Sequence, residues 1–259
     1  LAISRAVNEK ELTVKIEVDE NYILENIKKY KIPSSAESSK ELVFQAYKDG
    51  LKRLLLPSLK REALSELKEK ASSDAIILFG KNLKELLLTP PLVNQVILGM
   101  DPGYVSGCKL AVIDINGDYL ASNVIYPTKP REDFTSSSKI VLELIKKYKI
   151  NSIAIGNGTA SQETAAYVAK LIEENKLDVK FAIVSEIGAS VYSASKIAIQ
   201  EYPNLDVTIR GAISIAQRLR DPMAALVKID PKSLGIGQYQ HDVNQKELEQ
   251  KLENVTVDL

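Results

Sequence analysis

The order of the apolar segments after residue 95 most limits the folds open to this chain. Three short apolar runs come first, at 96–100, 109–114 and 119–126, and an Asn-Gly-Asp turn at 116–118 separates the last two. An Asn-Gly step between two apolar runs favours a tight hairpin, because both residues tolerate positive φ. The three runs therefore predict an antiparallel meander of buried strands.

An alternation of helical and strand patterns follows the meander. Apolar residues recur at helical spacing in four segments, and two short apolar runs have the length of buried strands. The expected helices are 135–148, 161–174, 189–200 and 210–227, and the expected strands are 152–156 and 181–184. The order β-β-β-α-β-α-β-α-α predicts an α/β fold with a mixed sheet of about five strands flanked by helices.

The first ninety residues have a different pattern, which predicts an α-rich segment. We expect a short strand at 11–17, because polar and apolar residues alternate there, and helices at 38–56, from Pro57 onward, and at 73–88. Two prolines after Thr89 end the last helix. The predicted division is an α-rich segment at 1–88, a linker at 89–95, the α/β domain at 96–229, and a lead-in to a further, truncated region at 230–259. A chain that starts at Leu1 rather than Met is expected to be a piece of a longer protein.

Composition excludes several classes of function. Lys plus Arg and Asp plus Glu both total 34, so any contact with a polyanion must be local. The single cysteine, Cys108, excludes a disulfide framework and a zinc site of several thiolates. The single histidine, His241, excludes a His–His metal site and disfavours a Ser-His-Asp triad. The longest uncharged run, 86–100, is too short to span a bilayer, so we expect no membrane partner.

Three acidic residues stand where catalytic carboxylates are often found. Asp101 follows the first expected strand, Glu186 follows a later one, and Asp221 begins a C-terminal helix. Each also has a purely structural interpretation: a turn residue, an acid at a helix N-terminus, and a helix cap. If all three meet at one edge of the sheet, they would suit two Mg²⁺ or Mn²⁺ ions and phosphodiester chemistry.

Two other features are candidate nucleic-acid contacts. The Gly156–Ser161 turn contains Asn157 and Thr159 ahead of a helix N-terminus, where anions are favoured; an ordinary strand–helix connection explains it equally well. A net positive stretch in the α-rich segment is the second candidate, and a solvated helix face is its alternative. Its basic residues are Lys48, Lys52, Arg53, Lys60 and Arg61.

Several longer motifs together resemble the Tex family of bacterial transcription accessory proteins. They begin with Val-Ile-Leu-Gly-Met-Asp-Pro-Gly at 96–103 and Ile-Gly-Asn-Gly-Thr-Ala-Ser at 155–161, and the longest is Lys-Ile-Asp-Pro-Lys-Ser-Leu-Gly-Ile-Gly-Gln-Tyr-Gln-His-Asp-Val at 228–243. Further matching segments are 184–195, 209–216 and 218–222. The resemblance covers almost the whole chain. It implies a central YqgF-like domain with the ribonuclease H and RuvC resolvase fold.

The resemblance also implies functional roles. Asp101, Glu186 and Asp221 match the positions of catalytic, metal-binding acids in YqgF-like nucleases, whereas Asn157 stands where RuvC-like resolvases have a Glu. We therefore expect a nucleic-acid-binding domain that is weak or inactive in cleavage. An active Mg²⁺- or Mn²⁺-dependent, resolvase-like nuclease is the alternative, and an ATP-binding fold of the actin and sugar-kinase type is a third.

The resemblance further implies the surroundings of the chain. Tex proteins carry an N-terminal helix-turn-helix region, helix-hairpin-helix modules and an RNA-binding OB-fold domain. The implied partners are RNA, single-stranded or structured DNA, and the transcription machinery, and the implied location is the cytoplasm.

Overall fold

The computed structural model describes residues 1–30, 32 and 39–259 of the chain. These residues form two compact units. One comprises residues 1–78 and 239–248, and the other comprises residues 79–238 and 249–259.

The second unit contains a five-stranded mixed sheet with the strand order β3-β2-β1-β4-β5. β2 pairs antiparallel with both β1 and β3, while β4 runs parallel to β1 and to β5. The predicted meander and the mixed sheet of about five strands are therefore confirmed. The strands are β1 (Ile97–Asp101), β2 (Cys108–Ile113), β3 (Tyr119–Ile125), β4 (Ser152–Gly156) and β5 (Lys180–Val184).

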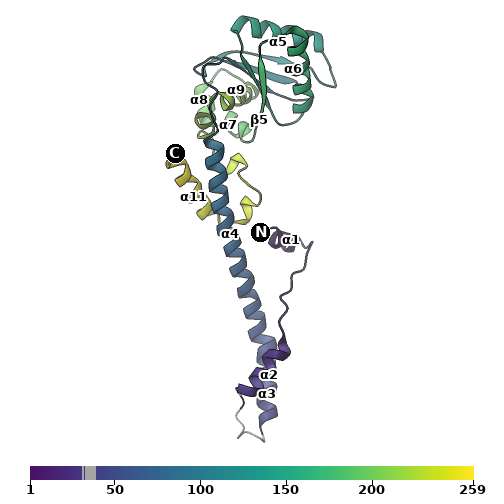
Figure 1. Cartoon of the computed structure of the whole chain (residues 1–259), viewed down its shortest axis with the longest axis vertical. Helices are drawn as coiled ribbons and strands as arrows, with labels where there is room; N and C mark the ends of the chain where they lie inside the picture. The colour runs from purple at the N-terminus through teal and green to yellow at the C-terminus, as the bar shows by residue number, and fades with distance from the viewer. Residues whose placement is uncertain (31, 33–38) are drawn as a thin grey trace. The chain divides into compact units, whose positions relative to one another are not determined.

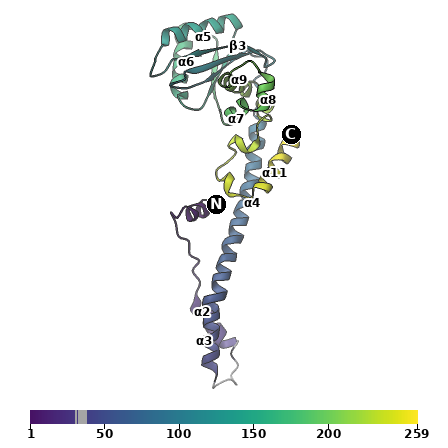
Figure 2. The same cartoon turned by 180° about the vertical axis from the view of Figure 1, so that it is seen from behind.

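Helices cover both faces of this sheet (Figure 1 and Figure 2). α5 (Phe134–Tyr148) and α6 (Ser161–Asn175) pack on one face, and α9 (Val207–Arg220) packs on the other. β1, β2 and β4 are buried almost throughout, because strands covered on both faces lose contact with water on both sides. Their continuous apolar runs in the sequence have this physical origin.

Two of the expected helices are each divided in two. The segment expected at 189–200 forms α7 (Ala189–Ser193) and α8 (Lys196–Glu201), because the Ser195 side chain accepts a bond from the Ala198 N–H and starts a new helix. The segment expected at 210–227 is divided at Asp221, which lies between α9 and α10 (Pro222–Leu226). In both cases the sequence pattern is helical throughout, but a side chain that caps the second helix ends the first one.

The N-terminal part is helical, as expected, but its division differs from the prediction. No strand forms at 11–17, which is extended without a strand partner among the described residues. Ser38, the expected start of a helix, lies outside the described residues. The elements are α1 (Ala2–Asn8), α2 (Glu20–Tyr30), α3 (Lys40–Gly50), the π-helical turn η1 (Leu51–Leu55) and α4 (Leu56–Leu87).

Pro57 does not separate two helices, and α4 continues unbroken through Ser73. Proline lacks the N–H that would bond the carbonyl four residues earlier, and a π-helical turn directly precedes it. The wider hydrogen-bond spacing of that turn accommodates the missing donor, so the chain stays helical. The prediction of two helices at this point was wrong for that reason.

The chain beyond α10 forms the 3₁₀ turns η2 (Pro231–Leu234) and η3 (Gln240–Asp242) and the helix α11 (Gln245–Val257). Of the helices in the described residues, none has the length and apolar character that crossing a bilayer requires.

Helix α9 packs directly against strand β1. A methyl group added at Gly99 would lie 2.2 Å from the Ala212 carbonyl oxygen and 2.9 Å from the Ala216 Cβ. Small residues on both elements let the two backbones pack directly against each other. This contact determines which α9 residues face the end of β1.

We predict that Gly99→Ala destabilises the second unit by about 3 kcal/mol, because the new methyl group must push α9 off the sheet. Urea unfolding followed by circular dichroism measures the change. Gly80→Ala in α4 is the matched control, because its methyl group would meet only side-chain atoms, the nearest being the flexible end of Lys251 at 3.0 Å. An equal effect of the two substitutions would contradict the prediction.

Candidate functional site

Asp101, the last residue of β1, faces α9. Side chains alternate along a strand, so residues 97, 99 and 101 share the face that α9 covers. A Cβ at Gly211 of α9 would lie only 3.2 Å from the Asp101 carboxylate. The missing side chain at Gly211 therefore leaves room for the carboxylate beside the helix.

Glu186 reaches the same region from beyond β5, although β4 lies between β5 and β1. Its carboxylate lies over the turn that follows β4. A Cβ at Gly158 would be 1.8 Å from one carboxylate oxygen of Glu186, and a Cβ at Gly156 would be 2.9 Å from the other. The two glycines thus provide the space through which Glu186 approaches Asp101.

Asn157 holds the loop that carries Glu186. Its side-chain oxygen accepts a 3.0 Å hydrogen bond from the Glu186 N–H, and its own N–H donates to the Val184 carbonyl at 3.0 Å. Asn157 therefore ties the end of β4 to the end of β5. Asn157 stands where the sequence resemblance implied a Glu, and it positions Glu186. The carboxylate of Glu186 occupies the space above Gly158.

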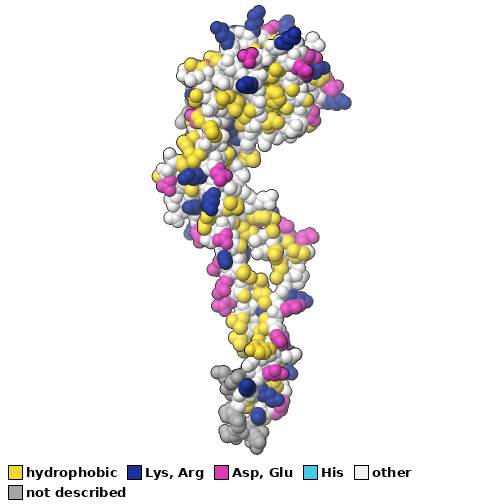
Figure 3. Space-filling model, viewed as in Figure 1, with side chains coloured by type: hydrophobic (Ala, Val, Ile, Leu, Met, Phe, Trp, Pro, Cys, Tyr) yellow, Lys and Arg dark blue, Asp and Glu magenta, His cyan; other side chains and the backbone are white. Residues whose placement is uncertain are grey.

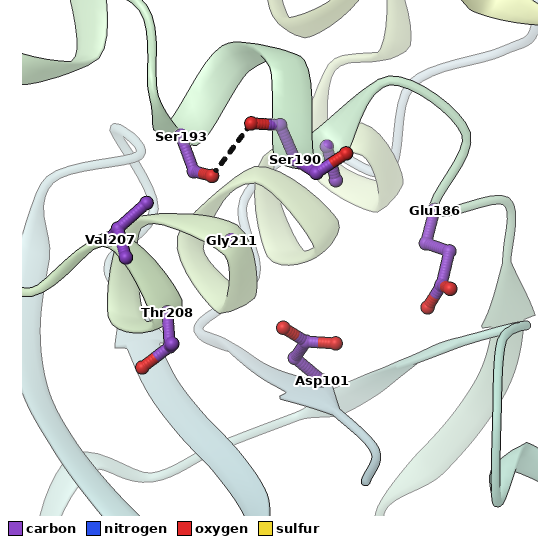
Figure 4. A pocket seen from close by; sticks show the side chains of 8 residues that line it. Asp101, Glu186, Ser190, Ser193, Val207, Thr208 and Gly211 are labelled. Carbon is purple, nitrogen blue, oxygen red and sulfur yellow. Dashed lines mark hydrogen bonds between the residues drawn. The ribbon is translucent and has the colours of Figure 1, made fainter. Parts of the chain in front are cut away.

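Asp101 and Glu186 line one open cavity of about 310 Å³ (Figure 4). Helix α7 contributes Ser190 and Ser193 to it, and α9 contributes Thr208 and Gly211. Both carboxylates point into the space below these helices. The cavity lies at the carboxyl ends of β1, β4 and β5, where parallel strands place functional groups.

Burial, together with the negative charge of Glu186, raises the pKa of Asp101 to about 6, although the positive charge of Lys109 opposes both effects. The pair therefore holds negative charge that the protein only partly compensates. A cation or a proton at this position relieves that repulsion.

Lys109 is a site residue that the sequence analysis missed. It lies on β2 opposite Asp101 and is buried. Its ammonium group donates to the Ser106 hydroxyl and, at 3.0 Å, to the Gly107 carbonyl. The available signal was a lysine inside an otherwise apolar strand, in register with the acid of the neighbouring strand.

Asp221 does not join the pair, so the expectation that three acids meet at one edge was wrong for this residue. Its carboxylate accepts a 3.0 Å bond from the Ala224 N–H and caps α10. It lines a different cavity, together with Asn116, Gly117 and Arg220. Pro222 starts α10 immediately after it, which directs the carboxylate to the helix end.

The other predicted contacts are placed as follows. Asn157 and Thr159 are exposed on the turn after β4. The five basic residues (Lys48, Lys52, Arg53, Lys60 and Arg61) all belong to the first unit. Two of them form ion pairs, Lys52 with Glu20 at 3.2 Å and Arg53 with Asp49 at 2.9 Å, which reduces the free positive charge of the stretch.

The acid pair suits one hard divalent cation. Carboxylate oxygens are the ligands that Mg²⁺ prefers, with water completing its coordination. Within the described part of the chain, no group of three or more His, Cys, Asp or Glu residues is placed to hold a metal. A second ion would need a further acid, and Asp221 does not supply one.

Comparison with known proteins identifies the family of the sheet domain. Residues 95–220 match the family model described as the Tex protein YqgF-like domain. This segment belongs to that family. The resemblance to Tex proteins drawn from the sequence motifs is thereby confirmed, and the chain contains a Tex YqgF-like domain.

Curated relatives extend the similarity beyond the domain. The protein tex of Bordetella pertussis is 49% identical over 205 residues, which are 79% of this chain and 26% of that protein. The human S1 RNA-binding domain-containing protein 1 is 41% identical over 265 residues, 98% of this chain and 26% of that protein. The chain thus spans between 26% and 35% of the length of the curated relatives it matches first.

Among solved structures, Thermus thermophilus RuvC in complex with a Holliday junction substrate aligns with 52% of this chain and 95% of its own. The sequence identity is 15% and the TM-score is 0.36.

We predict that Asp101→Asn stabilises the protein at neutral pH but not at pH 4. The pKa of the Asp101 carboxyl is about 4 in the unfolded chain and about 6 in the folded protein. The folded state therefore loses stability as pH rises through that window, because the carboxyl ionises more easily in the unfolded chain. The amide does not titrate, so its advantage should grow to about 2 kcal/mol between pH 4 and pH 7.5.

Urea unfolding at pH 4, 5.5 and 7.5 without divalent cations measures this difference. Asp178→Asn is the control, because its side chain is exposed. A stability difference between Asp101→Asn and the unsubstituted chain that does not change with pH would contradict the prediction.

Proposed function

We propose that this chain is the central part of a nucleic-acid-binding, Tex-type transcription accessory protein whose YqgF-like domain cleaves weakly or not at all. The observation that carries the proposal is the meeting of two acids, Asp101 and Glu186, without Asp221. In this proposal residues 96–229 are the YqgF-like domain, and 230–259 lead into a helix-hairpin-helix region. The whole protein would act in the cytoplasm on RNA or on single-stranded or structured DNA.

The loss of cleavage follows from the number of carboxylates. Two-metal phosphodiester cleavage places one ion at the attacking water and one at the leaving oxygen. Asp101 and Glu186 would hold a single Mg²⁺ or Mn²⁺, whose charge would attract one phosphate. With no acid for the second ion, the leaving oxygen would lack its electrostatic stabilisation.

Binding of nucleic acid is supported by the polar surroundings of the pair and by local positive charge. Asn157 and Thr159 are exposed on the turn after β4 and offer neutral hydrogen-bond donors. Basic side chains gather at the end of the sheet unit where α5 lies (Figure 3), and α5 carries Lys146 and Lys147 in its last turn. Because the net charge is zero, we expect few phosphate contacts and a shallow salt dependence.

The names of the relatives support the same proposal. A Neisseria gonorrhoeae relative that is 50% identical over 204 residues is named transcriptional accessory protein Tex, and the human relative is named for an S1 RNA-binding domain. Those names describe far longer proteins, so they support the proposed function of this chain but do not assign it.

An active divalent-metal-dependent nuclease is the second candidate. The observation that favours it is the convergence of Asp101 and Glu186 in one open cavity beneath α7 and α9. It requires that a substrate phosphate or a backbone oxygen complete the coordination of a second ion.

A cleavage assay with Mn²⁺ separates the two candidates. We predict that the chain leaves a four-way DNA junction, single-stranded DNA and single-stranded RNA intact, with product levels equal to those of Asp101→Asn. The same labelled substrates, titrated by fluorescence anisotropy at several salt concentrations, should bind with affinity that falls as salt rises. Cleavage that depends on both Mn²⁺ and Asp101 would establish the nuclease, and the absence of binding would overturn the proposal.

We predict that Gly158→Ala weakens Mn²⁺ binding about tenfold with little loss of stability, because the methyl group would displace the flexible carboxylate of Glu186. Isothermal titration calorimetry with Mn²⁺ measures the affinity. Asp221→Asn is the matched control, since its carboxylate lies in another cavity, and it should bind Mn²⁺ as the unsubstituted chain does. If Asp221→Asn weakens binding and Gly158→Ala does not, the assignment of the ligands is wrong.

A further inference from the structure

The outer edge of β5 is open for pairing. The Lys180 N–H donates to the Asn151 carbonyl at 3.2 Å, and the Val184 carbonyl accepts from the Asn157 N–H at 3.0 Å, so these groups face the β4 side. Alternate residues of a parallel strand point their backbone groups to opposite sides. The N–H and C=O groups of Phe181 and Ile183 therefore face outward, where the described residues provide no further strand.

An apolar cavity of about 250 Å³ lies beside this open edge. Its walls come from β5, from the ends of α4 and α9, and from α10 and η2. We call it the β5 groove, and the residues that define it are Ala182, Val184, Arg218, Leu219, Leu226 and Leu234. Ile187, which also lines it, is 45% exposed. Leu226 and Leu234 are buried, so the exposed aliphatic surface beside the unpaired strand edge comes from Ile187 and Ile183. Such a surface is suited to an extended ligand.

Arg218 is the charged residue of the groove, and its hydrogen bonding is incomplete. The side chain is 5% exposed, and its Nη1 donates to the Ser185 carbonyl at 2.6 Å. Its Nε and Nη2 atoms are buried without any partner. Glu186 is near enough to act on Arg218 electrostatically, but it does not supply a hydrogen-bond partner for these two atoms. A buried guanidinium with two unused donors costs free energy, which an oxygen acceptor in the groove would recover.

We propose that the β5 groove binds an extended peptide that carries a carboxylate between aliphatic side chains. The peptide backbone would pair with the outward groups of Phe181 and Ile183 and add a strand to the sheet. Its aliphatic side chains would fill the apolar walls, and its carboxylate would accept bonds from the free Nε and Nη2 of Arg218. Charge complementarity at Arg218 selects an acidic ligand, and the strand edge selects an extended one.

This binding site is separate from the acid pair and does not depend on the proposed nucleic-acid function. Arg218 and the apolar residues of the groove are absent from the lining of the cavity that holds Asp101 and Glu186. The failure of either proposal therefore leaves the other standing.

A peptide titration tests the proposal. The probe is a fluorescein-labelled heptapeptide, Lys-Val-Leu-Glu-Val-Leu-Lys, blocked at both ends, and binding to the chain is followed by fluorescence anisotropy. We expect saturable binding that weakens about tenfold when Gln replaces the Glu, since a charge-assisted pair is lost. We expect a similar loss when alternate peptide nitrogens are methylated, because strand pairing needs those donors.

Variants of the chain locate the site. Arg218→Met and Ile187→Glu should each weaken binding of the Glu peptide about tenfold or more, the first by removing the donors and the second by repelling the carboxylate. The Ile187 variant alters an exposed side chain, so it tests the groove even if Arg218→Met fails to fold. Arg220→Met is the matched control on the same helix, because its Nε donates to the Ile115 carbonyl and it lines another cavity.

Three results would overturn the proposal. The first is no binding of the Glu peptide, and the second is equal binding of the Glu and Gln peptides. The third is binding that survives N-methylation while octanoate competes with equal strength, which would identify the groove as a site for small amphipathic carboxylates instead.

Discussion

The contact between β1 and α9 is the constraint on which both sites depend. A Cβ at Gly99 would lie 2.2 Å from the Ala212 carbonyl oxygen, so α9 can take its position against β1 because residue 99 has no side chain. That position places Gly211 beside Asp101 and, two turns further along the helix, Arg218 beside Ser185. The candidate metal pocket and the β5 groove are therefore positioned by a single helix that small residues hold against the strand.

Buried charge is distributed unevenly around this helix. Asp101 and Glu186 carry like charges into one cavity, and Lys109 offsets only part of their repulsion, so the pKa of Asp101 is raised. Burial also lowers the pKa of Arg218 to about 10, although Glu186 opposes that effect. Folding alone gains little from such groups. Their retention is consistent with sites that bind a cation at one end of α9 and an anionic group near the other.

Much of the sheet could be predicted because its signals are local. The Asn-Gly turn, the apolar runs and the strand–helix alternation each depend on neighbouring residues, and so does the position of Asp101 and Glu186 after their strands. The errors occurred where two local signals competed, or where a local pattern needed a partner elsewhere in the chain. A cap at Asp221 interrupted a helical pattern, a π-helical turn carried a helix through Pro57, and the alternating segment at 11–17 found no strand partner among the described residues.

The amino-acid sequence by itself determined the fold class, the Tex resemblance and two of the acids, because periodicity and motif spacing are written along the chain. Only the tertiary structure decided which acids meet. Glu186 reaches Asp101 across the end of β4 because Gly156 and Gly158 leave space for it, and Asp221 is held away by its own helix end. Lys109 and the unpaired donors of Arg218 also emerged only in three dimensions, because burial and unused hydrogen-bonding capacity depend on what packs around a residue.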